Sequence, residues 1–469
     1  MIGEEVLYRT VTELSADIKA RRISPVELTE AYLDRIDQYA DRYNAFATVT
    51  PDVALEQARE AEREISRGRY KGPLHGIPYG AKDLLATAGI KTTWGAAPTK
   101  DQMFDEDATV IRKLREAGAV LLGKLAMVEF AGCLGYREAG ASLQGPGRNP
   151  WDRERWTGGS SSGTGASVSA GFVAFGIGTE TWGSILCPSA FCGVTGLRPT
   201  YGRVSRAGGM VGSYSLDKIG PMARSAADCR LILHAIAGSD PRDLTSSDEP
   251  VQIDRRRPNY GRLRAALIPS DFAKTPGAER EVGSRFDDAV EDLRRLGLRI
   301  ETAALPDLPA SELTTAILYA EAISAFEPFF EDGSVRKLHD PYAPYQREVT
   351  AALTGSDYIK ASRMRTVLQE RMAEFFGTYD VIVATNFLSV APSIHEDFTK
   401  TLPYPDPVGA VGNGCGLPAI ALPMGPGKDG MPTSFQIMGS PFDEGLLLDL
   451  GEAYQGATRH HMARPPVGA

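Results

Sequence analysis

Short apolar runs alternate with helical patterns along most of this chain, and no other feature constrains the fold as strongly. One run ends at Lys82 and Asp83, a helix is expected over residues 107–117, and the run AVLLGKL follows Gly118. Later runs of the same kind are LRAALIP, RIETAAL and DVIVATNF, and two more precede a C-terminal helix. Because strands joined by helices produce this alternation, the sequence predicts an α/β protein.

The segment between residues 158 and 220 is dense in glycine and serine, yet it is not a flexible linker. Apolar residues such as Phe172, Ile177, Ile185 and Leu197 are interspersed through it and can be buried. Small residues in such a setting indicate close approaches between backbones.

Two other regions have a clear local pattern. Residues 8–65 read as helical, with Ser24-Pro25-Val26-Glu27 predicting a capping box and a proline at the first helical position. The polar run over residues 239–262 is the best candidate for a hinge or surface loop.

Length alone predicts two or three domains, because 469 residues exceed the size at which single cores usually stop growing.

The composition narrows the expected partners and compartment. With 51 Lys and Arg against 60 Asp and Glu, the net charge is −9, which argues against nucleic acid as a partner. The acidic start is not followed by an apolar segment, and residues 166–177 are too short and glycine-rich to span a bilayer. The five cysteines fit neither a disulfide framework nor a zinc pattern, so we expect buried thiols in a cytoplasmic protein that binds no membrane.

Lys82, Ser160 and Ser184 are the candidate catalytic residues, although each also has a simple structural explanation. A lysine at a strand end usually reaches solvent, Ser160 could cap the helix that follows it, and Ser184 could be a small core residue. A serine hydroxyl becomes a good nucleophile only when a base takes its proton, and no histidine lies near Ser184 in the sequence.

A lysine can replace the histidine only when its amine is neutral. This requires lowering its pKa from about 10.4 toward 7, at a cost of about 4 to 5 kcal/mol, which burial can supply. A second serine between the lysine and the nucleophile would relay the proton. Successive backbone N–H groups leading into Ser184 could then bind the oxyanion of a tetrahedral intermediate.

Three consecutive motifs carry a resemblance to a known family. GGSSSG, then GTETWGSI, then PSAFCGVTGLRPTYGRVS resemble the signature of the amidase signature family, and elements such as GPLHGIPYGAKD and GLPAIALPMG extend the similarity through nearly the whole chain. The resemblance implies an α/β/α sandwich with a mixed central sheet flanked by helices. It also implies one domain over residues 1–469, with a core of about 72–222, an N-terminal helical segment at 8–65 and a variable substrate-entrance region of about 239–376.

The resemblance also implies roles for individual residues, because members of this family use a Ser–cis-Ser–Lys triad. Lys82 would be the general base and acid, Ser160 the bridging residue with a cis peptide bond, and Ser184 the nucleophile that forms the acyl-enzyme. The oxyanion hole is implied at the backbone N–H groups of Thr181, Trp182, Gly183 and Ser184.

The chain departs from the family pattern around the candidate nucleophile. Members commonly read Asp-Thr-Gly-Gly-Ser-Ile-Arg where this chain has Glu180-Thr181-Trp182-Gly183-Ser184-Ile185-Leu186. The indole of Trp182 either packs in the core beneath the loop or walls the acyl or leaving-group pocket, which would favour flat or apolar substrates. Leu186 removes a charge that could have paired with the acidic residue six positions earlier.

Two other classes of protein compete with this interpretation. An α/β-hydrolase would use Ser161 within Gly159-Ser160-Ser161-Ser162-Gly163, but the preceding NPWDRERWT is too polar for the required strand. His395, His460 and His461 are expected at the surface, so none is a convincing catalytic base for Ser161. A binding or scaffold protein with a degenerate site would not need all three triad residues.

The predicted function is hydrolysis of a small-molecule carboxylic amide through an acyl-enzyme on Ser184, with esters and carbamates accessible to the same chemistry. The alternative is the glutaminase (A) subunit of a tRNA-dependent amidotransferase, which works with partner subunits; Trp182, Leu186 and Asn386 argue against it. No metal or organic cofactor is expected, and a homodimer is left open.

Several aromatic residues between about 315 and 360 are expected either to line the substrate entrance or to pack in the core. They are Tyr319, Phe326, Phe329, Phe330, Tyr342 and Tyr345.

Overall fold

The computed structural model describes residues 2–250, 258–401 and 406–467. Within these ranges, eleven strands form one sheet in the order β1-β3-β2-β6-β8-β7-β12-β13-β11-β9-β10. A separate two-stranded ribbon pairs β4 with β5. The strands are β1 (Phe46–Val49), β2 (Pro78–Lys82), β3 (Val120–Leu125), β4 (Arg148–Asn149), β5 (Asp152–Trp156), β6 (Phe175–Glu180), β7 (Thr195–Arg198), β8 (Lys218–Ala223), β9 (Arg264–Leu267), β10 (Arg299–Thr302), β11 (Val381–Thr385), β12 (Ala419–Pro426) and β13 (Pro432–Gly439).

The large sheet is mixed. β2 pairs in parallel with both β3 and β6, and β9 does so with both β10 and β11, whereas the pairs from β6 through β13 to β11 are antiparallel. The runs predicted as strands on either side of Gly118 and near the C-terminus correspond to β2, β3, β12 and β13. The predicted α/β fold with a mixed central sheet is therefore confirmed.

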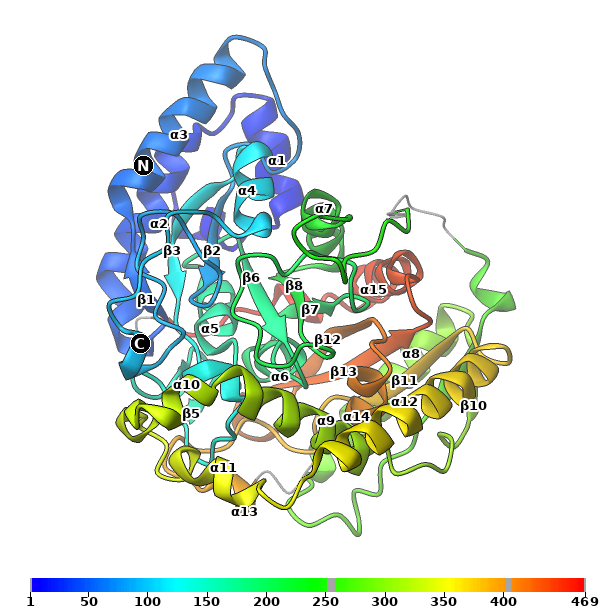
Figure 1. Cartoon of the computed structure of the whole chain (residues 1–469). Helices are drawn as coiled ribbons and strands as arrows, with labels where there is room; N and C mark the ends of the chain where they lie inside the picture. Colours follow the sequence, from blue (N-terminus) through cyan, green and yellow to red (C-terminus); the bar gives the residue numbers. More distant parts are fainter. Residues whose placement is uncertain (1, 251–257, 402–405, 468–469) are drawn as a thin grey trace.

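Helices flank this sheet along its length (Figure 1). In the figure, α1 to α4 lie near the end that carries β1 and β3, and α12 runs past the end that carries β10. The helices are α1 (Val11–Lys19), α2 (Pro25–Tyr39), α3 (Pro51–Ser66), α4 (Thr109–Glu116), α5 (Ser162–Ala170), α6 (Leu186–Cys192), α7 (Ala226–Ile236), α8 (Arg280–Arg295), α9 (Ala310–Ala325), α10 (Glu327–Glu331), α11 (Gln346–Val349), α12 (Gly355–Phe376), α13 (Phe398–Thr401), α14 (Gly409–Gly414) and α15 (Glu444–Thr458).

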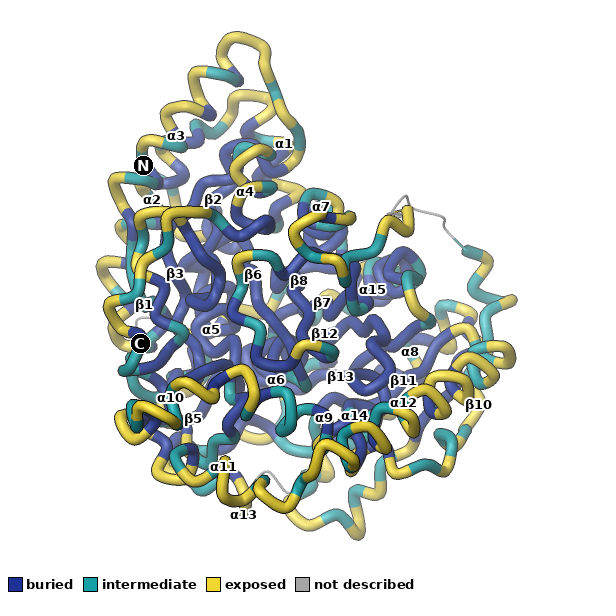
Figure 2. The backbone as a smooth tube through the Cα atoms, viewed as in Figure 1, coloured by how far each residue is buried: buried dark blue, intermediate teal, exposed yellow. Residues whose placement is uncertain are grey.

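Burial follows this layered arrangement. Figure 2 shows the central strands and α5 as buried, with exposed residues concentrated on outer helices such as α3 and α12. Every residue of α5 is buried, which explains its sequence of small residues: its backbone packs closely against β2, β3 and β6. The glycine-rich segment is therefore part of the core, as its interspersed apolar residues predicted. No helix within the described ranges is both long and apolar enough to cross a membrane.

Two local predictions need correction or qualification. Ser24 caps α2 by accepting from the N–H groups of Val26 and Glu27. The reciprocal bond of a capping box, from the Ser24 N–H to the Glu27 carboxylate, is absent among the described residues. The Ser24 hydroxyl also donates to the carboxylate of Glu62 on α3, which ties the two helices together. Part of the predicted hinge, residues 251–257, lies outside the described residues.

Candidate active site

Lys82 is completely buried at the end of β2, so its interpretation as a surface lysine is wrong. Its Nζ lies 2.8 Å from the Ser160 hydroxyl and 2.9 Å from the Thr179 hydroxyl, with the Thr179 carbonyl at 3.4 Å. β2 and β6 are parallel neighbours, and their pairing of Ala81 with Ile177 brings Thr179 beside the amine. The strand register therefore provides Lys82 with polar partners in a buried position.

Burial lowers the pKa of Lys82 to about 7. A charged amine loses its hydration in the interior, and this effect outweighs the opposing attraction from Cys133, Asp217 and Glu180. A substantial fraction of the Lys82 amine is thus neutral near pH 7, which is the form that can accept a proton.

Ser160 follows a cis peptide bond between Gly159 and Ser160. It does not cap the next helix, because the residue at the N-cap of α5 is Ser161. The Ser161 hydroxyl donates to the Thr179 carbonyl at 3.2 Å and accepts from the Thr179 N–H at 3.3 Å. Ser161 is therefore held by the backbone of β6, which does not suit the exposed nucleophile of an α/β-hydrolase.

Ser184 lies between β6 and α6 and is 7% exposed. Its carbonyl accepts a hydrogen bond from the Ser161 N–H at 3.3 Å, which holds the two serine segments side by side. Among the described residues, the Ser184 hydroxyl has no hydrogen-bond partner. The structure thus joins Lys82 to Ser160 but leaves Ser184 unbonded at its hydroxyl. Catalytic hydrogen bonds often tighten only when substrate binds.

The loop that leads into Ser184 presents free backbone donors. The N–H groups of Thr181, Trp182, Gly183 and Ser184 donate to no described residue. Gly183 has a φ of +84°, a conformation that favours glycine and directs the loop without a side chain at this point. Successive unpaired N–H groups are the arrangement that binds a developing oxyanion.

Glu180 holds the two ends of this loop together. Its carboxylate accepts from the N–H groups of Ile185 and Leu186 at 2.9 and 3.0 Å, and it forms a 2.8 Å ion pair with Arg198. Burial alone would raise the pKa of Glu180, but Arg198 and Lys218 lower it overall. Arg198 therefore supplies the positive charge that Leu186 lacks, so the predicted change in local electrostatics is compensated from β7.

Three polar residues around this loop were missed by sequence reasoning. Thr179 contacts the Lys82 amine, Asp217 accepts from the Thr181 hydroxyl at 2.5 Å, and the buried Lys218 donates to the Thr181 carbonyl at 3.3 Å. Burial lowers the pKa of Lys218 to about 7. Asp217 and Lys218 could have been found from the sequence, because an acid and a base stand side by side there at the start of an apolar strand.

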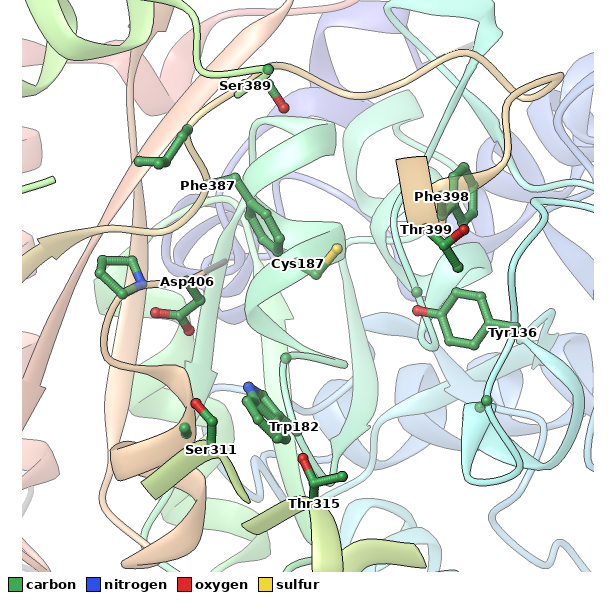
Figure 3. Close-up of a pocket in the computed structure, with 18 of the residues that line it drawn as sticks. Tyr136, Trp182, Cys187, Ser311, Thr315, Phe387, Ser389, Phe398, Thr399 and Asp406 are labelled. Carbon is green, nitrogen blue, oxygen red and sulfur yellow. The ribbon is translucent and has the colours of Figure 1, made fainter. Parts of the chain in front are cut away.

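A cavity of about 820 Å³ opens beside Trp182 and Gly183. In Figure 3 the Trp182 indole lies beside Ser311 and Thr315 of α9, and Cys187 lies on its other side. The indole N–H is buried and has no hydrogen-bond partner among the described residues. Trp182 thus walls the cavity, and its interpretation as a core residue beneath the loop is wrong.

The remaining lining is mostly neutral. Burial raises the pKa of Asp406 to about 7 and that of the Cys187 thiol to about 12. No lysine, arginine or histidine lines the cavity in the described part of the chain. Other lining residues labelled in Figure 3 are Tyr136, Ser311, Thr315, Phe387, Ser389, Phe398 and Thr399.

Of the six aromatic residues predicted at the substrate entrance, one lines this cavity, namely Tyr319. Phe326 and Phe329 pack instead on Phe130. Their ring centroids lie 4.6 and 4.9 Å, respectively, from that of Phe130. Tyr342 and Tyr345 are largely exposed. The packing alternative therefore holds for Phe326 and Phe329, whereas Tyr342 and Tyr345 neither line this cavity nor pack in the core.

The cysteines are buried as predicted, whereas two of the three histidines expected at the surface are partly buried. His395 is exposed and bonds Glu154, whereas His460 and His461 are partly buried. All five cysteines are free and buried. Within the described ranges, no three His, Cys, Asp or Glu side chains come together as metal ligands.

Comparison with known proteins gives a consistent result. A family profile described as Amidase matches residues 27–448. The A subunit of glutamyl-tRNA(Gln) amidotransferase from Moorella thermoacetica is 38% identical over an alignment of 495 positions, which covers 99% of each chain. The chain therefore belongs to the amidase family, as its resemblance to the amidase signature family predicted, and its class is that of a hydrolase.

Solved structures agree with this family. The peptide amidase from Stenotrophomonas maltophilia superposes with a TM-score of 0.84 at 32% identity, covering 98% of each chain. The A subunit of glutamyl-tRNA(Gln) amidotransferase from Thermotoga maritima has a TM-score of 0.84 at 29% identity and covers all of both chains. The shared fold thus includes both amidases and amidotransferase subunits.

Proposed function

We propose that this protein hydrolyses a carboxylic amide through an acyl-enzyme on Ser184. The observation that carries this proposal is the dry Lys82 amine, 2.8 Å from Ser160 and with a pKa lowered to about 7. When the amine is neutral, its two N–H bonds are directed to the hydroxyl and carbonyl of Thr179. This arrangement leaves its lone pair to accept the proton of the Ser160 hydroxyl.

The proton path follows from this arrangement. Lys82 accepts the Ser160 proton while Ser160 accepts that of Ser184, and the Ser184 oxygen attacks the amide carbon. The free N–H groups of residues 181–184 stabilise the resulting oxyanion. The proton then returns through Ser160 to the leaving amine, the C–N bond breaks, and water hydrolyses the acyl-enzyme by the same route.

Sequence similarity supports glutamine as the amide, with the protein acting as the A subunit of an amidotransferase. The 38% identical A subunit from Moorella thermoacetica carries this candidate. The three substitutions that argued against it have local explanations. Arg198 compensates for Leu186, Asn386 donates to Ser434 within the fold, and Trp182 keeps its backbone N–H while changing only the cavity wall.

The cavity itself favours a second candidate, a free-standing amidase for neutral amides. Glutamine carries a carboxylate, and the described lining offers no cationic side chain to bind it. Aromatic side chains such as Trp182, Phe387 and Phe398 suit flat or apolar substrates, including aryl amides, esters and carbamates. The structural similarity to a peptide amidase is compatible with this candidate.

One set of assays separates these candidates. The purified protein is tested with glutamine and with a panel of linear amides, anilides, esters and carbamates, beside Ser184→Ala and Lys82→Ala. Activity on the panel alone supports the amidase, whereas glutaminase activity and co-purification with two partner proteins support the subunit. Turnover that survives both substitutions would rule out the proposed chemistry.

A further inference from the structure

A second cavity, of about 670 Å³, lies next to the catalytic one along α9. Ser311 and Thr315 line the catalytic cavity, whereas Ala320 and Ile323 line the second. Tyr319 lines both, and its hydroxyl has no hydrogen bond to any described residue. α9 thus forms part of both walls, and one tyrosine is shared between them.

Glu321 gives the second cavity its charge, since it is the one ionisable acid or base among the described lining residues apart from tyrosines. Its carboxylate accepts from the Ser213 hydroxyl, the Ser215 N–H and the Tyr358 hydroxyl. No basic side chain within the described ranges lies at ion-pair distance from it. Arg365 is directed instead to main-chain carbonyls, including that of Ser215.

Three tyrosines share this cavity with the carboxylate, and the hydroxyl of one of them, Tyr358, donates to it. Tyr214, Tyr319 and Tyr358 all line the second cavity. The guanidinium of Arg206 already lies 5.5 Å from the centroid of the Tyr214 ring, so one of these rings binds a cation within the protein. A carboxylate beside several aromatic rings is the combination that recognises ammonium groups.

The loop along the second cavity is bonded to the catalytic loop. The N–H groups of Gly212 and Ser213 donate to Asp217, and the same carboxylate accepts from the Thr181 hydroxyl. Ser213 also bonds Glu321, so a continuous set of hydrogen bonds runs from Glu321 to Thr181. A ligand that binds Glu321 therefore contacts a network that ends at the candidate oxyanion hole.

We propose that the second cavity binds a small organic ammonium group, either the charged end of an extended amide substrate or a free amine that binds separately. The case in which the ammonium group belongs to the substrate rests on the proposed amide hydrolysis, but binding of an ammonium group by itself does not. Binding is therefore measured first and without turnover.

The first experiment is a calorimetric titration of the protein with 2-phenylethylammonium and with the neutral 2-phenylethanol. The amine is expected to bind at least about tenfold more tightly than the alcohol, because the alcohol lacks the charge. Glu321→Gln should weaken binding of the amine by about tenfold, while Glu312→Gln, which removes the same charge from an exposed position on α9, should not. Equal affinity of the wild type and Glu321→Gln, or of amine and alcohol, would overturn the proposal.

A second variant tests the site independently, because Glu321→Gln could lose binding simply by failing to fold. Ser324→Trp leaves the carboxylate in place and fills the second cavity from its exposed rim. It should also weaken binding of the amine by about tenfold or more, with an unchanged thermal midpoint. Retained affinity in a stable Ser324→Trp protein would contradict the assigned site.

The source of the ammonium group is then assigned by kinetics. Two amides of equal length are compared, one ending in an ammonium group and the other in a methyl group. A higher kcat/KM for the charged amide that is lost in Glu321→Gln identifies the substrate as the source. A change in kcat/KM for a short neutral amide on addition of 2-phenylethylammonium, also lost in Glu321→Gln, identifies a separate ligand.

Discussion

Replacing Lys82 by methionine should abolish turnover and, near neutrality, make the protein more stable. The ordinary pKa of a lysine is 10.5, and burial lowers that of Lys82 to about 7. At pH 7 the unfolded chain carries this amine almost fully charged, so folding must desolvate or deprotonate it. Methionine has a similar length and no charge, so it avoids this cost.

The size of the effect follows from the pKa values and the hydrogen bonds. The difference between 10.5 and about 7 corresponds to about 4 kcal/mol of lost stability at pH 7. Methionine also loses the bonds to Ser160 and Thr179, worth about 1 kcal/mol each. Lys82→Met should therefore raise the free energy of unfolding by about 2 kcal/mol at pH 7.

The sign of this difference should depend on pH. Because the folded-state pKa is lowered, the unfolded chain binds more protons between pH 7 and 10.5, so the wild type gains stability as pH rises. Above pH 10 the gain of Lys82→Met should disappear, leaving the variant about 2 kcal/mol less stable than the wild type.

Urea unfolding at pH 7, 8.5 and 10.3 measures this directly. Lys100→Met, at an exposed position, is the matched control and should show no such pH dependence. In parallel, kcat/KM of the wild type should rise with pH through about 7 and then level off, because the neutral amine is the base. A Lys82→Met protein that is less stable than the wild type at pH 7 would refute the reasoning.

Three other substitutions test separate parts of the site. Ser160→Ala should lower kcat/KM by about 10² to 10⁴-fold with little effect on substrate binding, since it interrupts proton transfer; single-turnover kinetics would contradict this if acylation were unchanged. Glu180→Gln leaves Arg198 buried without its counter-ion and should cost about 3 to 5 kcal/mol in urea unfolding, whereas Glu301→Gln, in an exposed ion pair, should cost under about 1 kcal/mol. Trp182→Gly should reduce the preference for aryl over alkyl amides by about tenfold in kcat/KM, and an unchanged ratio across the two series would remove the indole from substrate selection.

The fold was largely predictable because its strands are short, apolar and separated by helices. The end of β2 at Lys82 and the start of β3 after Gly118 follow from local sequence, since both strands are completely buried and therefore read as apolar runs. The partner of Ser24 was not predictable. Its hydroxyl also donates to Glu62, which is remote in sequence and becomes a neighbour only when α2 packs on α3.

The candidate site was predictable where the chemistry is carried by unusual residues in a dense motif. Lys82 and Ser160 lie far apart in sequence, and their hydrogen bond agrees with the roles that the family resemblance implied. Thr179 could not be selected in this way, because a threonine at a strand end is ordinary until strand pairing brings it to Lys82. Asp406 presents the same difficulty, since its burial beside the cavity depends on segments from distant parts of the chain.

The lining of the catalytic cavity comes from two different parts of the polypeptide. The lining residues Tyr136 and Trp182 belong to the first half of the chain, as does the Lys82 side chain. α9 and lining residues such as Phe387 and Asp406 lie in the second half. Mutations in the second half can consequently change the cavity wall while the candidate catalytic groups stay fixed. Recombination between related genes at a junction after β8 would exchange the α9 wall of the cavity and retain Trp182 with the candidate catalytic groups, a route by which one ancestral scaffold can diversify.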